Sequence, residues 1–299
     1  MRHSLSWCTS TGSPGSCSDR YSSLPAGNMA NVRQEHAMTT TAARAWVADL
    51  YDSYVTSTRD IPFFVEEARR TYGPVLELMS GTGRVSLPLA RIGVDLTCVD
   101  LSGPMLARLR GKLEAEGLSA TLHEANVACM RLPERGYTLA LLPFQSFGEL
   151  VEPRDQRLAL QRIAEHLTPG GRFICTLHNP RLRTAGVDGQ LRLLGTFPMA
   201  DTGGTLALWT VQQPDADPAV VRALQFYELY DAEGRMTAKR MLDVRFRLVE
   251  RAEFLELATA AGFSVEDLYG DYDRTPFDDE HSPFMLWVLK RNAAGKPVA

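Results

Sequence analysis

Val75-Leu-Glu-Leu-Met-Ser-Gly-Thr-Gly-Arg84 is the stretch that decides the fold of this 299-residue chain. An apolar run, interrupted by Glu77, leads into a turn that holds Gly81 and Gly83. Glycine adopts backbone conformations that a Cβ forbids, and it lets a ligand approach the backbone closely. Seventeen residues after Gly83 a second apolar run ends in Asp100, where an acid can accept hydrogen bonds from the hydroxyls of a ribose. The spacing therefore predicts a strand, a glycine turn, a helix and a ligand that contains ribose.

Strand-like and helix-like segments alternate outward from this stretch. Strands are expected at 75–79, 94–100, 120–125, 137–144 and 172–178, with helices at 84–92, 102–117 and 153–167. Short connections between such segments are typical of βαβ units, which build a parallel sheet with helices on both faces.

The rhythm changes between residues 181 and 249, where no convincing helical pattern occurs. Apolar and polar residues alternate with a period of two there, most clearly from Met236 to Leu248, and turn-forming clusters divide the segment. That period predicts an antiparallel meander with one covered face. A helix at 250–261 and strands at 263–270 and 284–291 follow it.

Two ligands compete for the glycine turn: a nicotinamide dinucleotide and S-adenosylmethionine. A dinucleotide fingerprint requires a third glycine, and Ser86 stands at that position. Dinucleotide sites also place a pyrophosphate at a helix N-terminus, which an ionised Glu77 would repel. S-adenosylmethionine carries a ribose, an ammonium and a sulfonium and has no phosphate, so Glu77 and Asp100 favour it.

These motifs make residues 75–178 resemble a class I S-adenosylmethionine-dependent methyltransferase. VLELMSGTGR resembles motif I of that family, CVDLSGPML the ribose-binding strand end, and LTPGGRF the turn before strand five. The resemblance implies a Rossmann-like α/β fold with a seven-stranded, mostly parallel sheet in the order 3-2-1-4-5-7-6 and an antiparallel strand 7. The insert at 181–249 resembles the β-cap of glycine- and aminosugar-type N-methyltransferases, which covers a small substrate or pairs chains into dimers.

The same resemblance assigns the cofactor site. Glu77, Gly81, Thr82 and Gly83 would hold the methionine end, and Asp100 the ribose. Arg84 would either meet the methionine carboxylate or cover a helix face. The remaining expected contacts to the cofactor are Leu101, Met105, Asn126, Val127, Pro143, Phe144 and the lid residue Tyr54. Met79 stands where many members carry a glycine, and Asn126 where many carry an aspartate.

Candidate residues for the acceptor lie past the carboxyl ends of the parallel strands, where open α/β sheets bind ligands. His178 and Gln145 are expected to act at the reacting groups, together with Tyr51 from an N-terminal Tyr-Asp-x-Tyr segment. Phe147, Asn179, Tyr269, Asp271 and Tyr272 are expected to contact the substrate. Acidic residues at 271–280 could attract a cationic amine or could be a solvated loop.

Composition limits the partners. Lys plus Arg number 32 and Asp plus Glu 36, a formal charge of −4, which argues against nucleic acid as the main partner. No run of about 18 apolar residues exists to span a membrane. Five scattered cysteines without a CxxC pair give neither a metal site nor a disulfide scaffold and suit the cytoplasm.

The expected organisation is a disordered tail at 1–40, a methyltransferase core at 41–180 and 250–292, a β-cap at 181–249 and a C-terminal tail at 293–299. The expected function is methyl transfer from S-adenosylmethionine to a small molecule, with an amine favoured and no metal. Alternatives are an O-methyltransferase acting on a hydroxyl or carboxylate, an NAD(P)-dependent oxidoreductase, and a non-catalytic S-adenosylmethionine-binding protein. A homodimer through the insert is kept open.

Overall fold

Two sheets organise residues 45–293, the part of the chain that the computed structural model describes. The first has seven strands in the order β10-β11-β5-β4-β1-β2-β3, and the second has four in the order β6-β7-β8-β9. The tail expected at 1–40 lies outside the described residues, as do residues 294–299.

The seven-stranded sheet confirms the expected order and direction of its strands. Strands β1 to β5 pair in parallel, and β11 runs antiparallel between β5 and β10. The strands are β1 (Val75–Leu78), β2 (Leu96–Asp100), β3 (Thr121–Glu124), β4 (Tyr137–Leu142), β5 (Leu167–His178), β10 (Phe263–Tyr269) and β11 (Phe284–Arg291). Glu77 lies on the central strand, opposite Cys98 on one side and Leu141 on the other.

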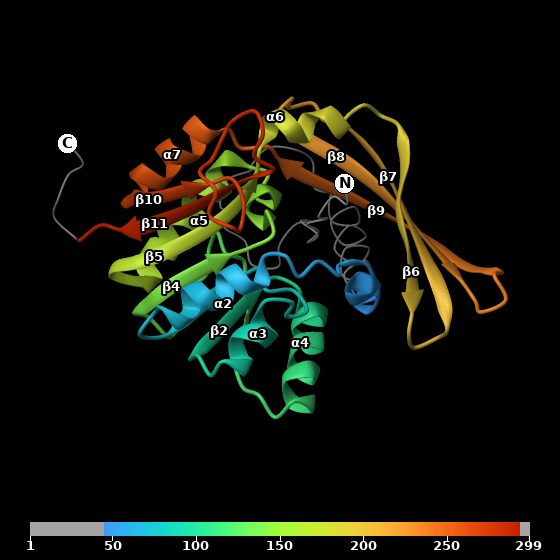
Figure 1. Cartoon of the computed structure of the whole chain (residues 1–299), viewed down its shortest axis with the longest axis horizontal. Coiled ribbons are helices and arrows are strands. Elements are labelled where there is room, and N and C mark those ends of the chain that lie inside the picture. The colour runs from blue at the N-terminus through green and yellow to red at the C-terminus, as the bar shows by residue number, and fades with distance from the viewer. Residues whose placement is uncertain (1–44, 294–299) are drawn as a thin grey trace, which may run out of the picture.

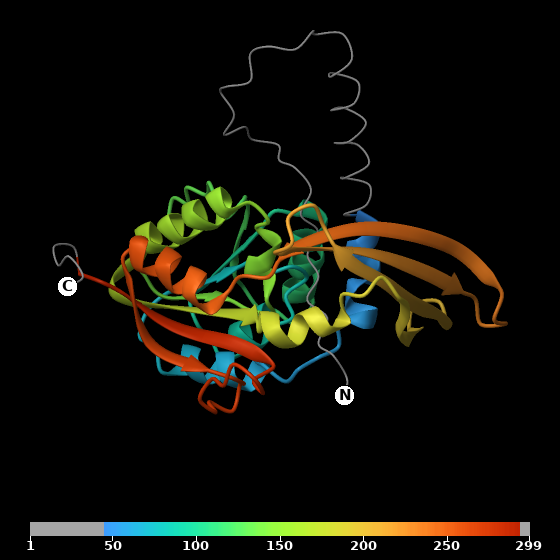
Figure 2. The ribbon, with the colours of Figure 1, turned by 90° about the horizontal axis from the view of Figure 1, so that it is seen from above.

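Helices cover both faces of this sheet (Figure 1, Figure 2). One face carries α2 (Ile61–Arg69), α3 (Ser86–Arg91) and α4 (Gly103–Ala115), whose apolar side chains share a core with the sheet. The other carries α5 (Pro153–His166) and α7 (Arg251–Ala260). Because both faces are covered, all four residues of β1 are buried.

The insert forms the second sheet, a four-stranded antiparallel meander, as the period of two predicted. Its strands are β6 (Leu191–Met199), β7 (Gly204–Pro214), β8 (Val220–Tyr230) and β9 (Met236–Arg247). The sequence did not indicate the short helices that join β5 to it, α6 (Pro180–Arg183) and η2 (Thr184–Gly186). Each is only about one turn long, too short for a helical period to show.

The carboxyl ends of the parallel strands face the inner surface of this second sheet (Figure 1). One apolar cluster joins Phe144 after β4 and Met105 on α4 to buried cap residues such as Phe246, and to the helix at residues 45–54. Among the described residues no helix has the length and apolarity to cross a membrane. Residues 45–293 also contain no group of three or more His, Cys, Asp or Glu side chains placed to hold a metal ion.

Candidate active site

The glycine turn after β1 has three left-handed residues in close succession. Met79 has a φ of 54°, Gly81 of 56° and Gly83 of 91°. A Cβ on Gly83 would lie 2.3 Å from Leu109 Cδ1, so a larger residue there would have to displace the Leu109 side chain. Met79 adopts a conformation that a side chain disfavours, which explains why a glycine suits this position in the resembling family.

Glu77, the third residue of β1, has an unpartnered carboxylate oxygen. Its side chain is 1% exposed, and Oε2 has no hydrogen-bond partner among the described residues. Burial raises the pKa of Glu77 to about 8, against the opposing positive charge of Arg84. A buried carboxylate of this kind needs a cationic or hydrogen-bonding partner to be ionised.

Asp100 organises the ribose side of the turn. Its Oδ2 accepts the Gly81 N–H at 2.8 Å, and its Oδ1 accepts the Ser102 N–H at 2.8 Å. A carboxylate has about four acceptor sites, so ribose hydroxyls are compatible with both bonds. Ser102 caps α4 by accepting the Met105 N–H, as a serine at this position favours.

Arg84 forms a buried, two-pronged ion pair with Asp60. Its Nη2 donates to Asp60 Oδ2 at 2.6 Å and its Nη1 to Oδ1. The guanidinium also donates to the Ser57 carbonyl at 3.0 Å and lies 4.3 Å from the Phe144 ring centre. Asp60 stands at the N-cap of α2 without making a side-chain cap, because its carboxylate is turned to Arg84.

The residues expected around adenine fall into two groups. Met105 is 2% and Val127 4% exposed, and each packs in an apolar cluster, while Leu101 is half-buried between β2 and α4. The side-chain Oδ1 of Asn126 accepts the Ala128 N–H at 2.8 Å, which closes the turn after β3. Its amide N–H groups are donors, so this asparagine presents donors where an aspartate would present only acceptors.

The loop after β4 has the strongest signs of a functional constraint. Phe144 and Gln145, which follow Pro143, have φ values of 62° and 61° in succession. Gln145 is 3% exposed, yet neither its Oε1 nor its Nε2 has a partner among the described residues. Left-handed non-glycine residues and unpaired buried amides each cost free energy and concentrate at functional sites. Phe147 instead packs on Phe254 with no exposed surface, which favours a core role over substrate contact.

The helix at residues 45–54 packs against both the turn and the cap. Thr82 Oγ1 donates to Asp52 at 2.6 Å, and Lys112 bridges Asp52 and the Thr82 carbonyl. Tyr51 and Tyr54 are 6% and 3% exposed, and Tyr54 contacts the cap through ring contacts. Tyr54 thus joins this helix to the cap, and Tyr51 packs against Tyr54 in the same apolar cluster.

His178 lies at the end of β5, half-buried, with its ring centre 5.7 Å from that of Phe246 on the cap. Burial and the positive charge of Arg183 lower the pKa of His178 to about 3. The imidazole is neutral at physiological pH and can accept a hydrogen bond. A proton taken from an acceptor would be held weakly, since the imidazolium is disfavoured there.

We expect the His178 resonances to show no titration between about pH 5 and 8 by imidazole NMR, and Arg183→Gln to raise the pKa of His178. The folded pKa lies below the reference value of 6.5, so an unfolded chain binds the proton first. The stability contribution of neutral His178 is therefore lost as the pH falls from 6.5 toward 3. A midpoint near 6.5 in the folded protein would contradict this assignment.

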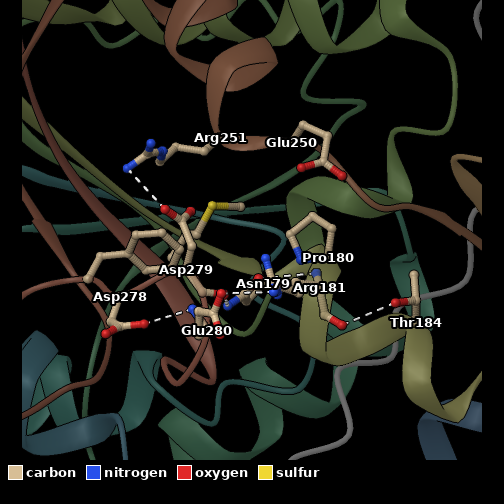
Figure 3. Close-up of a pocket in the computed structure, with 11 residues that line it drawn as sticks. Asn179, Pro180, Arg181, Thr184, Glu250, Arg251, Asp278, Asp279 and Glu280 are labelled. Atoms are coloured by element: carbon tan, nitrogen blue, oxygen red, sulfur yellow. Dashed lines mark hydrogen bonds and ion pairs between the residues drawn. The ribbon is translucent and has the colours of Figure 1, made fainter.

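Arginines pair with three of the five acidic side chains in the loop between β10 and β11. Asp271 pairs with Arg59, Asp279 with Arg251, and Glu280 with Arg181. The loop and α6 line an open hollow of about 750 Å³ (Figure 3). Its acidic side chains therefore offer little net charge to a cationic amine, which favours the interpretation as a solvated loop.

Other residues expected at the substrate have structural partners. Asn179 is 3% exposed, donates to the carbonyls of Asp279 and Ser282, and caps α6 by accepting the Arg181 N–H. Tyr272 packs against α2, and burial followed by the charge of Asp60 raises its pKa. Tyr269 packs at the edge of the same cluster, opposite Pro276.

The inner face of the cap carries polar groups whose role the sequence did not indicate. Thr210 Oγ1 and Gln225 Nε2 face one another across β7 and β8, and both are buried without a partner among the described residues. Gln225 Oε1 accepts the Tyr227 hydroxyl at 2.7 Å. A signal was present in the sequence: Thr210, Gln212 and Gln225 occupy positions of two alternating strands where apolar residues are expected.

Comparisons with known proteins agree with this geometry. Residues 75–171 match the family described as a methyltransferase domain. The demethylmenaquinone methyltransferase of Thermus thermophilus is 31% identical over 102 residues, 33% of this chain and 44% of that protein. The chain therefore spans less than half the length of that relative.

Two longer matches include the insert. The cypemycin N-terminal methyltransferase of a Streptomyces species is 27% identical over 249 residues, covering 81% of this chain and 94% of that one. The solved structure of the CcbJ methyltransferase from Streptomyces caelestis superposes with a TM-score of 0.70 at 26% identity, covering 83% of this chain and 96% of that one. Residues 75–171 thus match a methyltransferase domain, within a Rossmann-like fold that has an added antiparallel sheet.

Proposed function

We propose that this protein transfers a methyl group from S-adenosylmethionine to a small molecule, with an amine as the favoured acceptor. The observation that carries the proposal is the buried, unpartnered Glu77 Oε2 beside the glycine turn. An ammonium group is the natural partner for such an oxygen, and S-adenosylmethionine has one at its methionine end.

The residues present fit that cofactor. Glu77 would hold the ammonium, the Gly81–Gly83 backbone would allow close approach, and Asp100 would accept the ribose hydroxyls. When bound, the cofactor supplies a methyl group on a sulfonium, which leaves by in-line displacement. The chain itself has to position the acceptor and exclude water. No metal is proposed.

Neutral acceptors of hydrogen bonds support an amine as the nucleophile. Gln145 Oε1 and the imidazole of His178 can each accept an N–H, which would orient the nitrogen lone pair. The cypemycin N-terminal methyltransferase acts, by its name, at the N-terminus of cypemycin. A hydroxyl or carboxylate acceptor is the second candidate, since the same groups would accept an O–H.

Calorimetry against S-adenosylmethionine, S-adenosylhomocysteine and NAD tests the proposal. We expect micromolar binding of the first two and none of NAD, because Ser86 replaces the third glycine that a dinucleotide fingerprint requires. Binding of NAD without S-adenosylhomocysteine would support an oxidoreductase instead. Binding of S-adenosylmethionine without turnover of any acceptor would support a non-catalytic binding protein.

Asp100→Ala should weaken S-adenosylhomocysteine binding by roughly 1–3 kcal/mol, the usual loss for hydrogen bonds to a charged group. The variant also removes acceptors for the Gly81 and Ser102 N–H groups, so thermal stability has to be measured in parallel. Asp95→Ala, at a residue with no place in the site, is the control. Unchanged affinity in Asp100→Ala would contradict the ribose assignment.

The outer face of the cap supports a homodimer through the insert. Leu193, Trp209, Phe226 and Met241 are aligned across all four strands, and Leu193 and Met241 are 47% and 59% exposed. A second copy would cover this row, a role that apolar patches commonly serve. Sedimentation of Met241→Glu should give a lighter species than the parent protein.

We also propose a cytoplasmic location, because scattered cysteines without a disulfide pattern suit a reducing compartment.

A further inference from the structure

Arg183 is a half-buried cation without an acidic partner among residues 45–293. It ends α6, between β5 and the cap (Figure 1), and no carboxylate pairs with it among residues 45–293. Its Nη2 donates to Gln212 Oε1 at 2.5 Å, and its guanidinium lies 4.9 Å from the ring centre of Phe246. Other enclosed arginines differ: Arg84 pairs with Asp60 and Arg172 with Glu67.

Removing the guanidinium of Arg183 from water costs free energy that no carboxylate compensates. Burial lowers the pKa of Arg183 to about 10, so the guanidinium is charged at physiological pH. A guanidinium has five N–H donors in a planar fork, and Gln212 accepts one of them. The neutral amide and the aromatic face compensate only part of the lost hydration.

The groups around Arg183 have no negative charge to offer. His178 on β5 is neutral, and the charge of Arg183 itself helps to keep it so. Gln212 shares the inner face of the cap with Thr210 and Gln225, whose Oγ1 and Nε2 lack partners among the described residues. Hydrogen-bond donors thus converge on the region that the acceptor would occupy.

We propose that Arg183 binds an anionic group, a carboxylate or a phosphate, carried by the methyl acceptor. This inference rests on the proposed function, and it narrows the acceptor class to amines that also bear an anion. A planar guanidinium can donate two parallel hydrogen bonds to the oxygens of either a carboxylate or a phosphate. The bond to Gln212 would hold the guanidinium in position before the anion arrives.

Matched acceptor pairs test this inference. One arm compares α- and ω-amino acids with their carboxamides, and the other compares phosphoethanolamine and glucosamine 6-phosphate with the parent amines. Turnover is measured as S-adenosylhomocysteine release. We expect the anionic member of at least one arm to have a KM lower by about tenfold or more, equivalent to about 1.4 kcal/mol. The arm that shows the preference separates carboxylate from phosphate.

Variants on α6 separate recognition from folding. Arg183→Gln should abolish the preference for the anionic member by raising its KM to that of the neutral one. Arg183→Lys keeps the charge without the fork and should retain part of the preference. Arg181→Gln is the matched control, because Arg181 is exposed and pairs with Glu280 outside this group. It should retain the full preference.

If none of the matched acceptors is methylated, a binding measurement still tests the inference. In the complex with S-adenosylhomocysteine, an anion at Arg183 should raise the pKa of His178, and NMR titration of the imidazole detects this. The inference is overturned if neutral members are preferred, or if no anionic member affects either turnover or His178. Failure of the proposed function would show separately, as a lack of S-adenosylhomocysteine binding by calorimetry.

Discussion

Glu77→Gln is expected to weaken S-adenosylhomocysteine binding by between about tenfold and a hundredfold, the range of a lost hydrogen bond to a charged group. The same substitution should stabilise the unliganded protein. Burial raises the pKa of Glu77 from 4.5 to about 8, so ionisation is disfavoured in the folded state. Glutamine fills the same space without a charge. A variant that is more stable and binds worse separates a ligand-binding role from a structural one.

The sign of the stability effect follows from proton linkage. Below pH 4.5 the carboxyl is neutral in both states and Glu77 carries no ionisation penalty. As the pH rises from 4.5 to about 8, the unfolded chain loses the proton first, and stability falls across that window. At pH 7 the gain from Glu77→Gln should be about 3 kcal/mol. Urea denaturation at pH 5 and pH 8 measures it, with the exposed Glu256→Gln as control.

Cofactor binding should release a proton from Glu77 near neutral pH. An ammonium placed against the carboxylate favours its ionised form, which the unliganded protein holds only above about pH 8. Affinity should therefore rise with pH up to that value. Calorimetry in buffers of different ionisation enthalpy measures the released proton, and Glu77→Gln should lose the release. If the release persists in that variant, another group is responsible.

The core sheet was predictable because its determinants are local. Apolar runs at 75–79 and 137–144, each followed by a helix signal, indicate βαβ units without any knowledge of distant contacts. The strand ends were less predictable. β4 stops at Leu142, earlier than expected, because Phe144 and Gln145 adopt left-handed conformations that no residue-type preference indicates.

The pairing of charges was not predictable, because the partners are far apart in sequence. Asp271 lies beside Arg59, and Asp60 lies beside Arg84 instead of capping α2. From local sequence alone, Asp60 would cap the helix that follows it, and the acidic loop could either attract a cationic amine or be solvated. Arg183 had no periodicity or motif around it, and only the folded chain reveals that it lacks a carboxylate.

Arg84→Met is expected to destabilise the protein by about 3–5 kcal/mol, as typical when one partner of a buried ion pair is removed. The Asp60 side chain is 3% exposed and would be left as an uncompensated charge. Methionine retains contact with the Phe144 ring, so the loss reports mainly on the charge. Chemical denaturation measures it. Arg91→Met, which breaks the exposed pair with Glu116, should have a far smaller effect.

The double variant Arg84→Met/Asp60→Asn separates the two roles that remained open for Arg84. Removing both charges should recover most of the lost stability, since no buried ion is left unpaired. If Arg84 only fixes the turn by joining Ser57 and Asp60 to it, S-adenosylhomocysteine affinity should recover together with stability. If Arg84 also meets the methionine carboxylate, affinity should stay low although stability returns. Because Asp60 already occupies both ends of the guanidinium fork, we expect the first outcome.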